Sequence, residues 1–214
     1  IIDFCLTKKG RPLREGVAEW HAKARGKAVI DYGFHLMIPE INEAVLAELP
    51  VIMDEEGITS FKIFMAYKNV FQVDDGTLYQ TLVAARKLGA LVMVHAENGD
   101  VIDELVRQAL AAGNTDPIYH ARTRPPELEG EATGRAAALT ALADSRLYVV
   151  HVTCAEAVAR IAEARAKGLR VFGETCPQYL VLDESALEKP DFEGAKYVWS
   201  PPLRAKDHQE ALWN

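Results

Sequence analysis

Three residues that could take part in metal binding lie inside apolar segments of the chain. Lys62 lies within SFKIF, His95 within VMVHAE and His151 within YVVHVT. A buried ammonium without a partner is costly, so Lys62 requires a carboxylate, a lowered pKa or chemical modification. Imidazole nitrogens are common ligands of zinc. The three residues are therefore candidates for a metal site, against the alternatives of hydrogen-bonded structural histidines and an edge-strand lysine that reaches solvent.

The segments around these residues have the composition of β-strands. Apolar, β-branched runs predict strands at 1–6, 28–38, 59–66, 90–97, 146–153 and 170–177. Residues alternate between the two faces of a strand, so Phe61 and Ile63 share one face and Lys62 lies on the other. We expect the apolar face to pack on helices, and Lys62 and the two histidines to converge on the opposite side.

Helical patterns separate the predicted strands. One helix is expected from Asp74 or Asp75 to Gly89 and another over 154–167, with others near 40–49, 99–113 and 130–144. Segment 114–129 is rich in proline and arginine and is expected to be an ordered excursion. Alternating strands and helices indicate a mostly parallel sheet, either open and doubly wound or closed as a (β/α)8 barrel. No glycine-rich dinucleotide fingerprint follows a strand, which favours the barrel.

Composition excludes several classes of function. The chain has 214 residues, and its net charge of −7 argues against a nucleic-acid partner. No apolar run approaches 18 residues, so no membrane-spanning segment is expected. Three widely spaced cysteines without a CxxC pair favour a reducing compartment, and we predict a cytoplasmic protein.

Four motifs carry a resemblance to a known family. They are GITSFKIFMAYKN (57–69), VHAENGD (94–100), VHVT (150–153) and YVWSPPLR (197–204). Together they resemble the dihydropyrimidinase and D-hydantoinase family of cyclic amidohydrolases, and the resemblance extends over essentially the whole chain. It implies a TIM-like barrel in which residues 1–214 form the central part, with about six of the eight strand–helix units. Such a barrel carries catalytic residues at the carboxyl ends of its strands, where His95 and His151 are expected.

The resemblance also implies a centre of two divalent metal ions, usually zinc. Lys62 matches a lysine that is N-carboxylated by CO2 and bridges both ions. His95 and His151 match two histidines that bind the second ion. Cobalt and manganese tolerate the same ligands, so the sequence leaves the identity of the metal open.

Further matched positions concern the substrate. Tyr67 matches a tyrosine that hydrogen-bonds the substrate carbonyl and the developing oxyanion. Ser200 matches a residue whose backbone holds the cyclic amide, and Phe64 and Phe71 lie where the family has a hydrophobic lid. The implied reaction is hydrolysis of dihydropyrimidines or 5-substituted hydantoins to N-carbamoyl amino acids by a hydroxide that bridges the metals. Homotetramers are common in this family.

The sequence departs from the family pattern in its remaining metal ligands. It has no HxH pair, and Asp207 lies too close to the SPPLR motif to match the family's catalytic aspartate. We expect His21 on the surface, His35 in a structural role, and His120 and His208 in solvent. The small β-sandwich that the family builds from both chain ends is also absent. The chain is therefore predicted to be an internal piece of a longer enzyme, with little activity alone and with the HxH pair and the aspartate outside it.

Two alternatives remain open. One is a related amidohydrolase such as an allantoinase or a dihydroorotase, against which the FMAYKN segment with Tyr67 favours the hydantoinase reading. The other is a non-catalytic scaffold of the same fold, like the dihydropyrimidinase-like neuronal proteins. Such proteins generally lose metal-site residues, so the presence of Lys62, His95 and His151 argues against a scaffold.

Overall fold

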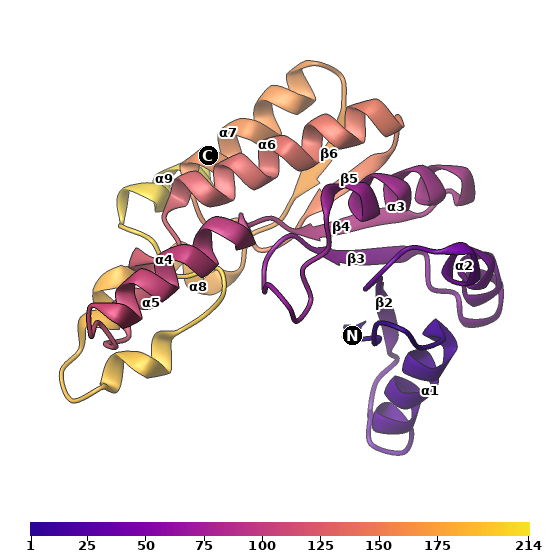
Figure 1. The fold of residues 1–214 in the computed structure, drawn as a ribbon, viewed down its shortest axis with the longest axis horizontal. Helices are drawn as coiled ribbons and strands as arrows, with labels where there is room; N and C mark the ends of the chain where they lie inside the picture. The colour runs from indigo at the N-terminus through magenta and orange to yellow at the C-terminus, as the bar shows by residue number, and fades with distance from the viewer.

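The computed structural model describes residues 1–214 and contains a single six-stranded parallel sheet (Figure 1). Its strands follow one another in chain order, each paired with the next: β1 (Ile2–Cys5), β2 (Gly33–Met37), β3 (Ser60–Phe64), β4 (Leu91–His95), β5 (Arg146–Val149) and β6 (Arg170–Gly173). A doubly wound sheet reverses its strand order at a switch point, and this sheet does not. The sequential order confirms the predicted barrel architecture, present here as six of eight strand–helix units.

Helices connect the strands and follow them around the sheet in chain order (Figure 1). The α-helices are α1 (Leu13–Ala24), α2 (Glu43–Glu56), α3 (Asp75–Leu88), α4 (Gly99–Ala111), α5 (Ile118–Arg122), α6 (Pro126–Ala143), α7 (Ala155–Ala166), α8 (Pro177–Val181) and α9 (Asp207–Trp213). Two short 3-10 turns, η1 (Glu184–Glu188) and η2 (Glu193–Tyr197), lie between α8 and α9. None of the helices is long and apolar enough to cross a bilayer.

The hydrophobic core lies between the strands and the helices, on one face of the sheet. Phe61 and Ile63 of β3 belong to the same cluster of buried side chains as Leu78 and Leu82 of α3. The predicted alternation is therefore confirmed, because Lys62 lies between these two residues and outside the core cluster. The polar residues of the strands are left on the opposite face, which corresponds to the axis of a barrel.

Local capping chemistry sets the helix that follows β3. The Asp74 side chain accepts a hydrogen bond from the Thr77 backbone N–H at 2.7 Å, and Gly89 ends the helix in the left-handed conformation. A carboxylate at the N-cap and a glycine after the last turn satisfy backbone groups that the helix leaves free. The bounds predicted for this helix are confirmed.

Several strand bounds are shorter than predicted. Residues 28–32 are not part of a strand, and Val29 is 96% exposed, because the partner strand β1 pairs with β2 only from Ile2 opposite Gly33. The predicted strand 146–153 ends at Val149, and His151 follows with φ of 44°. His151 is therefore oriented by a left-handed turn, and not by the pleat of β5 as predicted.

The predicted excursion at 114–129 is ordered, as expected, but much of it is helical. It contains α5 and the first turn of α6, which begins at Pro126, earlier than the predicted 130. Proline is favoured at the first position of a helix because its missing N–H would have no helical partner there. Helices α4, α5 and α8 lie together at one end of the molecule, far from α1 (Figure 1).

Candidate active site

Lys62 lies in the middle of β3 and is 2% exposed. It makes no ion pair, and its Nζ lies 4.8 Å from the ring centre of Phe64 and 5.2 Å from that of Phe4. Burial lowers the pKa of the Lys62 ammonium well below its usual value, and the Glu174 carboxylate opposes this shift. The aromatic faces compensate only part of the lost hydration. A free amine is therefore favoured at this position.

The two predicted histidine ligands meet at the carboxyl edge of the sheet. His95 is the last residue of β4, and His151 follows β5, which pairs with β4. The Nδ1 atom of His95 lies 2.8 Å from Nε2 of His151. The structure therefore brings together side chains that are 56 residues apart in the sequence.

Glu97 orients the imidazole of His95. Its Oε2 lies 2.7 Å from His95 Nε2, and both side chains are almost completely buried. A carboxylate accepts a hydrogen bond, so Nε2 of His95 carries the proton and Nδ1 presents its lone pair toward His151. A carboxylate behind a histidine is the usual arrangement around a metal-ligating imidazole. The role of Glu97 was not predicted from the sequence, although Glu97 lies within the VHAENGD motif. A carboxylate two residues after a histidine at a strand end could have suggested it.

Electrostatics keeps both imidazoles neutral. Burial lowers the pKa of His95 and of His151 well below the usual value for histidine. A charge on Lys62 would lower both pKa values further. Neutral imidazole is the form that binds metal ions.

The chemistry of these donors fits a divalent metal ion. Nδ1 of His151 is buried without a hydrogen-bond partner, and the nitrogens of the two rings face each other. The 2.8 Å separation is a hydrogen-bond distance, and a metal ion would take the place of the proton between the two nitrogens. Carboxylation of Lys62 would place an anion beside them. No group of three or more His, Cys, Asp or Glu side chains in this chain could hold a metal ion by itself, so this chain offers part of a donor set.

Tyr67 lies against the histidine pair. Its ring centre is 4.9 Å from that of His95 and 6.1 Å from that of Phe71, and Phe64 lies between these rings. The backbone of Tyr67 has φ of 69°, which turns the loop after β3 back over the strand end. Burial raises the pKa of the phenol, with a further contribution from Glu97. The phenol therefore stays protonated and able to donate a hydrogen bond.

The loop that carries Tyr67 is held by the start of α4. Lys68 and Gln72 both contact the Asp100 carboxylate, at 2.9 Å and 3.1 Å. The N–H of Gly99 donates to the Met65 carbonyl at 3.1 Å. A Cβ at Gly99 would lie 2.6 Å from Cα of Ala66, so only glycine allows the helix to approach this closely.

Ser200 reaches the same region from a distant part of the sequence. Its Oγ lies 3.1 Å from Nε2 of His120, and Ser200 lowers the pKa of the Tyr67 phenol against the larger effect of burial. The expectation that His120 lies in solvent is wrong. Helix α5 packs against η1, and its His120 is half-buried with Nε2 2.7 Å from the Trp199 carbonyl oxygen.

A buried ion pair lies behind His151 and was missed by sequence reasoning. The guanidinium of Arg204 donates to the Glu129 carboxylate and to Thr153 Oγ, both at 2.8 Å, and it contacts the Arg124 carbonyl. Glu129 also accepts from the Thr153 backbone N–H at 2.8 Å. Thr153 lies two residues after His151, so this network fixes the segment that positions His151. A charged pair formed across 75 residues leaves no periodic signal in the sequence.

The remaining histidines lie away from the pair. His35 points to the same face as Lys62 and contacts Ser60 Oγ at 2.5 Å, in agreement with a structural role. His208 was expected in solvent, but it is mostly buried and its Nδ1 accepts from the Ala155 N–H at 3.2 Å. His21 lies on α1 as predicted and is partly exposed beside Glu56.

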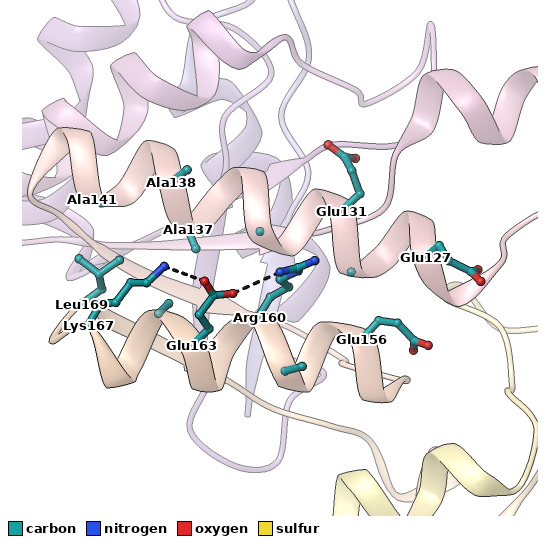
Figure 2. Close-up of a pocket in the computed structure, with 14 residues that line it drawn as sticks. Glu127, Glu131, Ala137, Ala138, Ala141, Glu156, Arg160, Glu163, Lys167 and Leu169 are labelled. Carbon is teal, nitrogen blue, oxygen red and sulfur yellow. Dashed lines mark hydrogen bonds and ion pairs between the residues drawn. The ribbon is translucent and has the colours of Figure 1, made fainter.

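A large groove of the molecule is separate from these residues. It is a groove of about 850 Å³ between α6 and α7, lined by small residues such as Gly134 and Ala137 and by charged residues such as Glu163 (Figure 2). In Figure 2, Glu163 forms ion pairs with Arg160 and Lys167 on its own helix. None of the candidate site residues lines this groove, so the site is defined by side-chain chemistry and not by cavity size.

Comparison with known proteins identifies relatives along the whole chain. The chain is 76% identical over 214 residues to the D-hydantoinase of Geobacillus stearothermophilus and 54% identical to that of Streptomyces coelicolor, covering 45% of each relative. It is 43% identical to the dihydropyrimidinase of Arabidopsis thaliana. The chain is a homologue of the D-hydantoinases and dihydropyrimidinases. This homology extends over its full length and confirms the resemblance drawn from the sequence motifs. No family model matches the chain.

Solved structures show the same relationship for this hydantoinase homologue. A crystal structure of D-hydantoinase superposes with a TM-score of 0.99 at 77% identity, covering the whole chain and 46% of that structure. A dihydroorotase from Campylobacter jejuni superposes with a TM-score of 0.59 at 15% identity, which shows the shared fold alone. The chain therefore spans less than half of the length of the relatives it matches.

Proposed function

We propose that this chain is the central part of the barrel of a metal-dependent cyclic amidohydrolase. The whole protein would hydrolyse the cyclic amide bond of dihydropyrimidines or 5-substituted hydantoins and release N-carbamoyl amino acids. The observation that carries this proposal is the meeting of two neutral, buried imidazoles beside a buried lysine without an ion-pair partner. The names of the homologues, D-hydantoinase and dihydropyrimidinase, support the substrate class.

His95 Nδ1, His151 Nε2 and a carboxylated Lys62 would hold the metal ions, for which zinc is the first candidate. The lowered pKa of Lys62 supports its modification, because the free amine attacks CO2: an N–C bond forms and a proton is lost, leaving an anionic carbamate. Bound divalent ions would supply a nucleophile from water near neutral pH and polarise the amide carbonyl. The remaining ligands would come from outside residues 1–214.

The other candidate residues would act on the substrate directly. Tyr67, protonated because burial raises its pKa, would donate a hydrogen bond to the oxyanion that forms at the attacked carbonyl. The backbone of Ser200 would hold the amide of the ring. Phe64 and Phe71, whose rings lie 5.2 Å apart, would form the apolar wall that contacts the ring substituent.

Two alternatives receive less support from the structure. A scaffold protein would have no need of the paired neutral histidines and the buried Lys62. A dihydroorotase-like or allantoinase-like reaction finds no specific support, since the likeness to dihydroorotase shows the fold only. The small cyclic amide as partner, the homotetramer and the cytoplasmic location remain proposals from the resemblance.

Metal content and activity test the proposal together. The protein with its complete barrel should contain divalent metal by elemental analysis and open dihydrouracil and a 5-substituted hydantoin. Lys62→Ala should lose both metal and activity, whereas Lys23→Ala, which removes an exposed lysine of α1, should retain both. A metal-free wild type, or a Lys62→Ala protein with normal activity, would contradict the assignment.

The isolated segment of residues 1–214 provides a second test. Residues 1–214 alone should show little hydrolysis, since they do not supply a complete donor set. Near-normal rates from these 214 residues would mean that Lys62, His95 and His151 suffice, and that the additional ligands expected from the family are unnecessary.

A further inference from the structure

One half-buried histidine of the site has no role in the function proposed above. His120 lies on α5, and its Nε2 contacts two groups of the distant segment 197–204: the Trp199 carbonyl oxygen at 2.7 Å and Ser200 Oγ at 3.1 Å. The two segments are about 80 residues apart in the sequence. The contact therefore joins an inserted helix to the residue expected to hold the substrate ring.

The partners of His120 determine which of its nitrogens carries the proton. A carbonyl oxygen can only accept a hydrogen bond, so Nε2 of His120 carries the proton and donates it to Trp199. The same N–H reaches the hydroxyl of Ser200 as a second acceptor. One N–H of His120 therefore links helix α5 to both residues of the Trp199–Ser200 segment.

Helix α5 provides a firm base for this contact. Its Ile118 and Ala121 pack with Leu187 of η1 in a hydrophobic cluster of their own, separate from the main core. Tyr197, just before Trp199, packs against the same cluster. The segment that carries Ser200 is thus held from both sides, by apolar packing at Tyr197 and by the imidazole at Trp199.

We propose that His120 is a positioning residue for the substrate site: it holds the Trp199–Ser200 segment in place. This inference rests on the proposed function. His120 touches neither the candidate metal ligands nor any reacting atom. Its effect on hydrolysis would therefore pass through the backbone of Ser200, which is proposed to hold the substrate ring.

Substitutions at His120 separate this role from a general contribution to folding. His120→Phe keeps a planar ring and removes the donor. His120→Gln places an amide N–H near the position of Nε2, whereas His120→Asn has a donor that is too short to reach Trp199. His21→Phe serves as the control, because it removes a partly buried histidine of the remote helix α1 that contacts Tyr32 and Glu56.

The first measurement is independent of catalysis. Hydrogen exchange of the peptide 197–204, in the full-length metal-loaded protein, should be about tenfold faster in His120→Phe and in His120→Asn, which lose one buried hydrogen bond. It should return to the wild-type rate in His120→Gln and stay unchanged in His21→Phe. Unchanged exchange in His120→Phe would overturn the proposal, whether or not the protein opens cyclic amides.

The second measurement follows hydrolysis of a 5-substituted hydantoin. His120→Phe should raise KM and lower kcat, each by about three- to tenfold, and His120→Gln should recover most of both. The rise in KM should persist in a Tyr67→Phe background, because the Trp199–Ser200 segment would hold the ring independently of the phenol. An unchanged KM in His120→Phe would mean a structural role only and would refute the proposal. A wild type that opens no cyclic amide would instead refute the proposed function, and the exchange data would still decide whether His120 holds the segment.

Discussion

The buried pair of Arg204 and Glu129 gives the sharpest prediction about stability. Their side chains are 5% and 3% exposed, and Arg204→Met would remove the guanidinium while keeping much of its apolar volume. The carboxylate of Glu129 would lose its bond from Arg204 at 2.8 Å and keep the two from Thr153. Removing one partner of a buried ion pair costs about 3–5 kcal/mol, and the retained bonds place this case near 3 kcal/mol.

Urea denaturation of wild type and variants measures this cost. We expect Arg204→Met to shift the midpoint by an amount equivalent to about 3 kcal/mol without changing the slope. The double variant with Glu129→Gln should cost less than the sum of the two single variants, since the neutral amide does not need the guanidinium. Arg107→Met, which breaks an exposed pair with Glu104 on α4, should leave the midpoint unchanged.

A loss below 1 kcal/mol in Arg204→Met would refute the reasoning, because it would mean that solvent or another cation compensates the Glu129 carboxylate. The variant should also bind metal more weakly. The network includes Thr153, two residues after His151, so its loss should loosen the histidine that Thr153 helps to position. Metal content after dialysis, measured beside that of Arg107→Met, checks this second consequence.

Three further predictions concern the histidine pair and its surroundings. The metal-free protein should lose stability as pH falls below about 6.5, because His95 and His151 take up protons in the unfolded chain and stay neutral in the fold. Thermal unfolding between pH 7.5 and 5 measures this loss. The double variant His95→Asn/His151→Asn should show a weaker dependence of the unfolding temperature on pH. Glu97→Ala should weaken metal binding about 10- to 100-fold with little change in fold. Competition with a chelator measures the zinc affinity, and an unchanged affinity would exclude the proposed orientation of His95 by Glu97. Gly99→Ala should displace the loop that carries Tyr67 and reduce kcat. Gly134→Ala on α6, where a Cβ has at least 3.4 Å of clearance, should leave the stability of the fold unchanged or raise it by up to about 1 kcal/mol. Equal kcat values for the two variants would contradict the packing argument.

Strands and helix bounds were predictable where the signal is local. The alternation of Phe61, Lys62 and Ile63 predicted which face of β3 packs on helices, and Asp74 and Gly89 predicted the bounds of α3. Strand ends were less predictable, since pairing with a neighbour decides where a strand stops. Residues 28–32 have a β-rich composition and lack a partner strand, so they stay outside the sheet.

The candidate site also contains residues that the sequence revealed and residues that only the structure revealed. Lys62, His95 and His151 stand out in the sequence because each interrupts an apolar run, and their motifs carry the family resemblance. Glu97 was missed although its partner His95 lies two residues away. His120, Arg124, Glu129 and Arg204 were not singled out, because their partners lie elsewhere in the chain. His120 was placed in solvent for this reason: nothing in segment 114–129 indicates that Trp199 and Ser200 will cover it.

The sequence by itself determined the alternation of strands and helices, the caps of α3 and the positions of a lysine and two histidines at strand centres and ends. These features depend on neighbours within a few residues, so periodicity and capping chemistry reveal them. Only the tertiary structure decided that the strands pair in sequential order, that Nδ1 of His95 meets Nε2 of His151, and that His120 holds the segment of Ser200. Such contacts join residues 50 to 80 positions apart, and they arise when packing of the helices on the sheet brings the strand ends and the inserted segments to one edge.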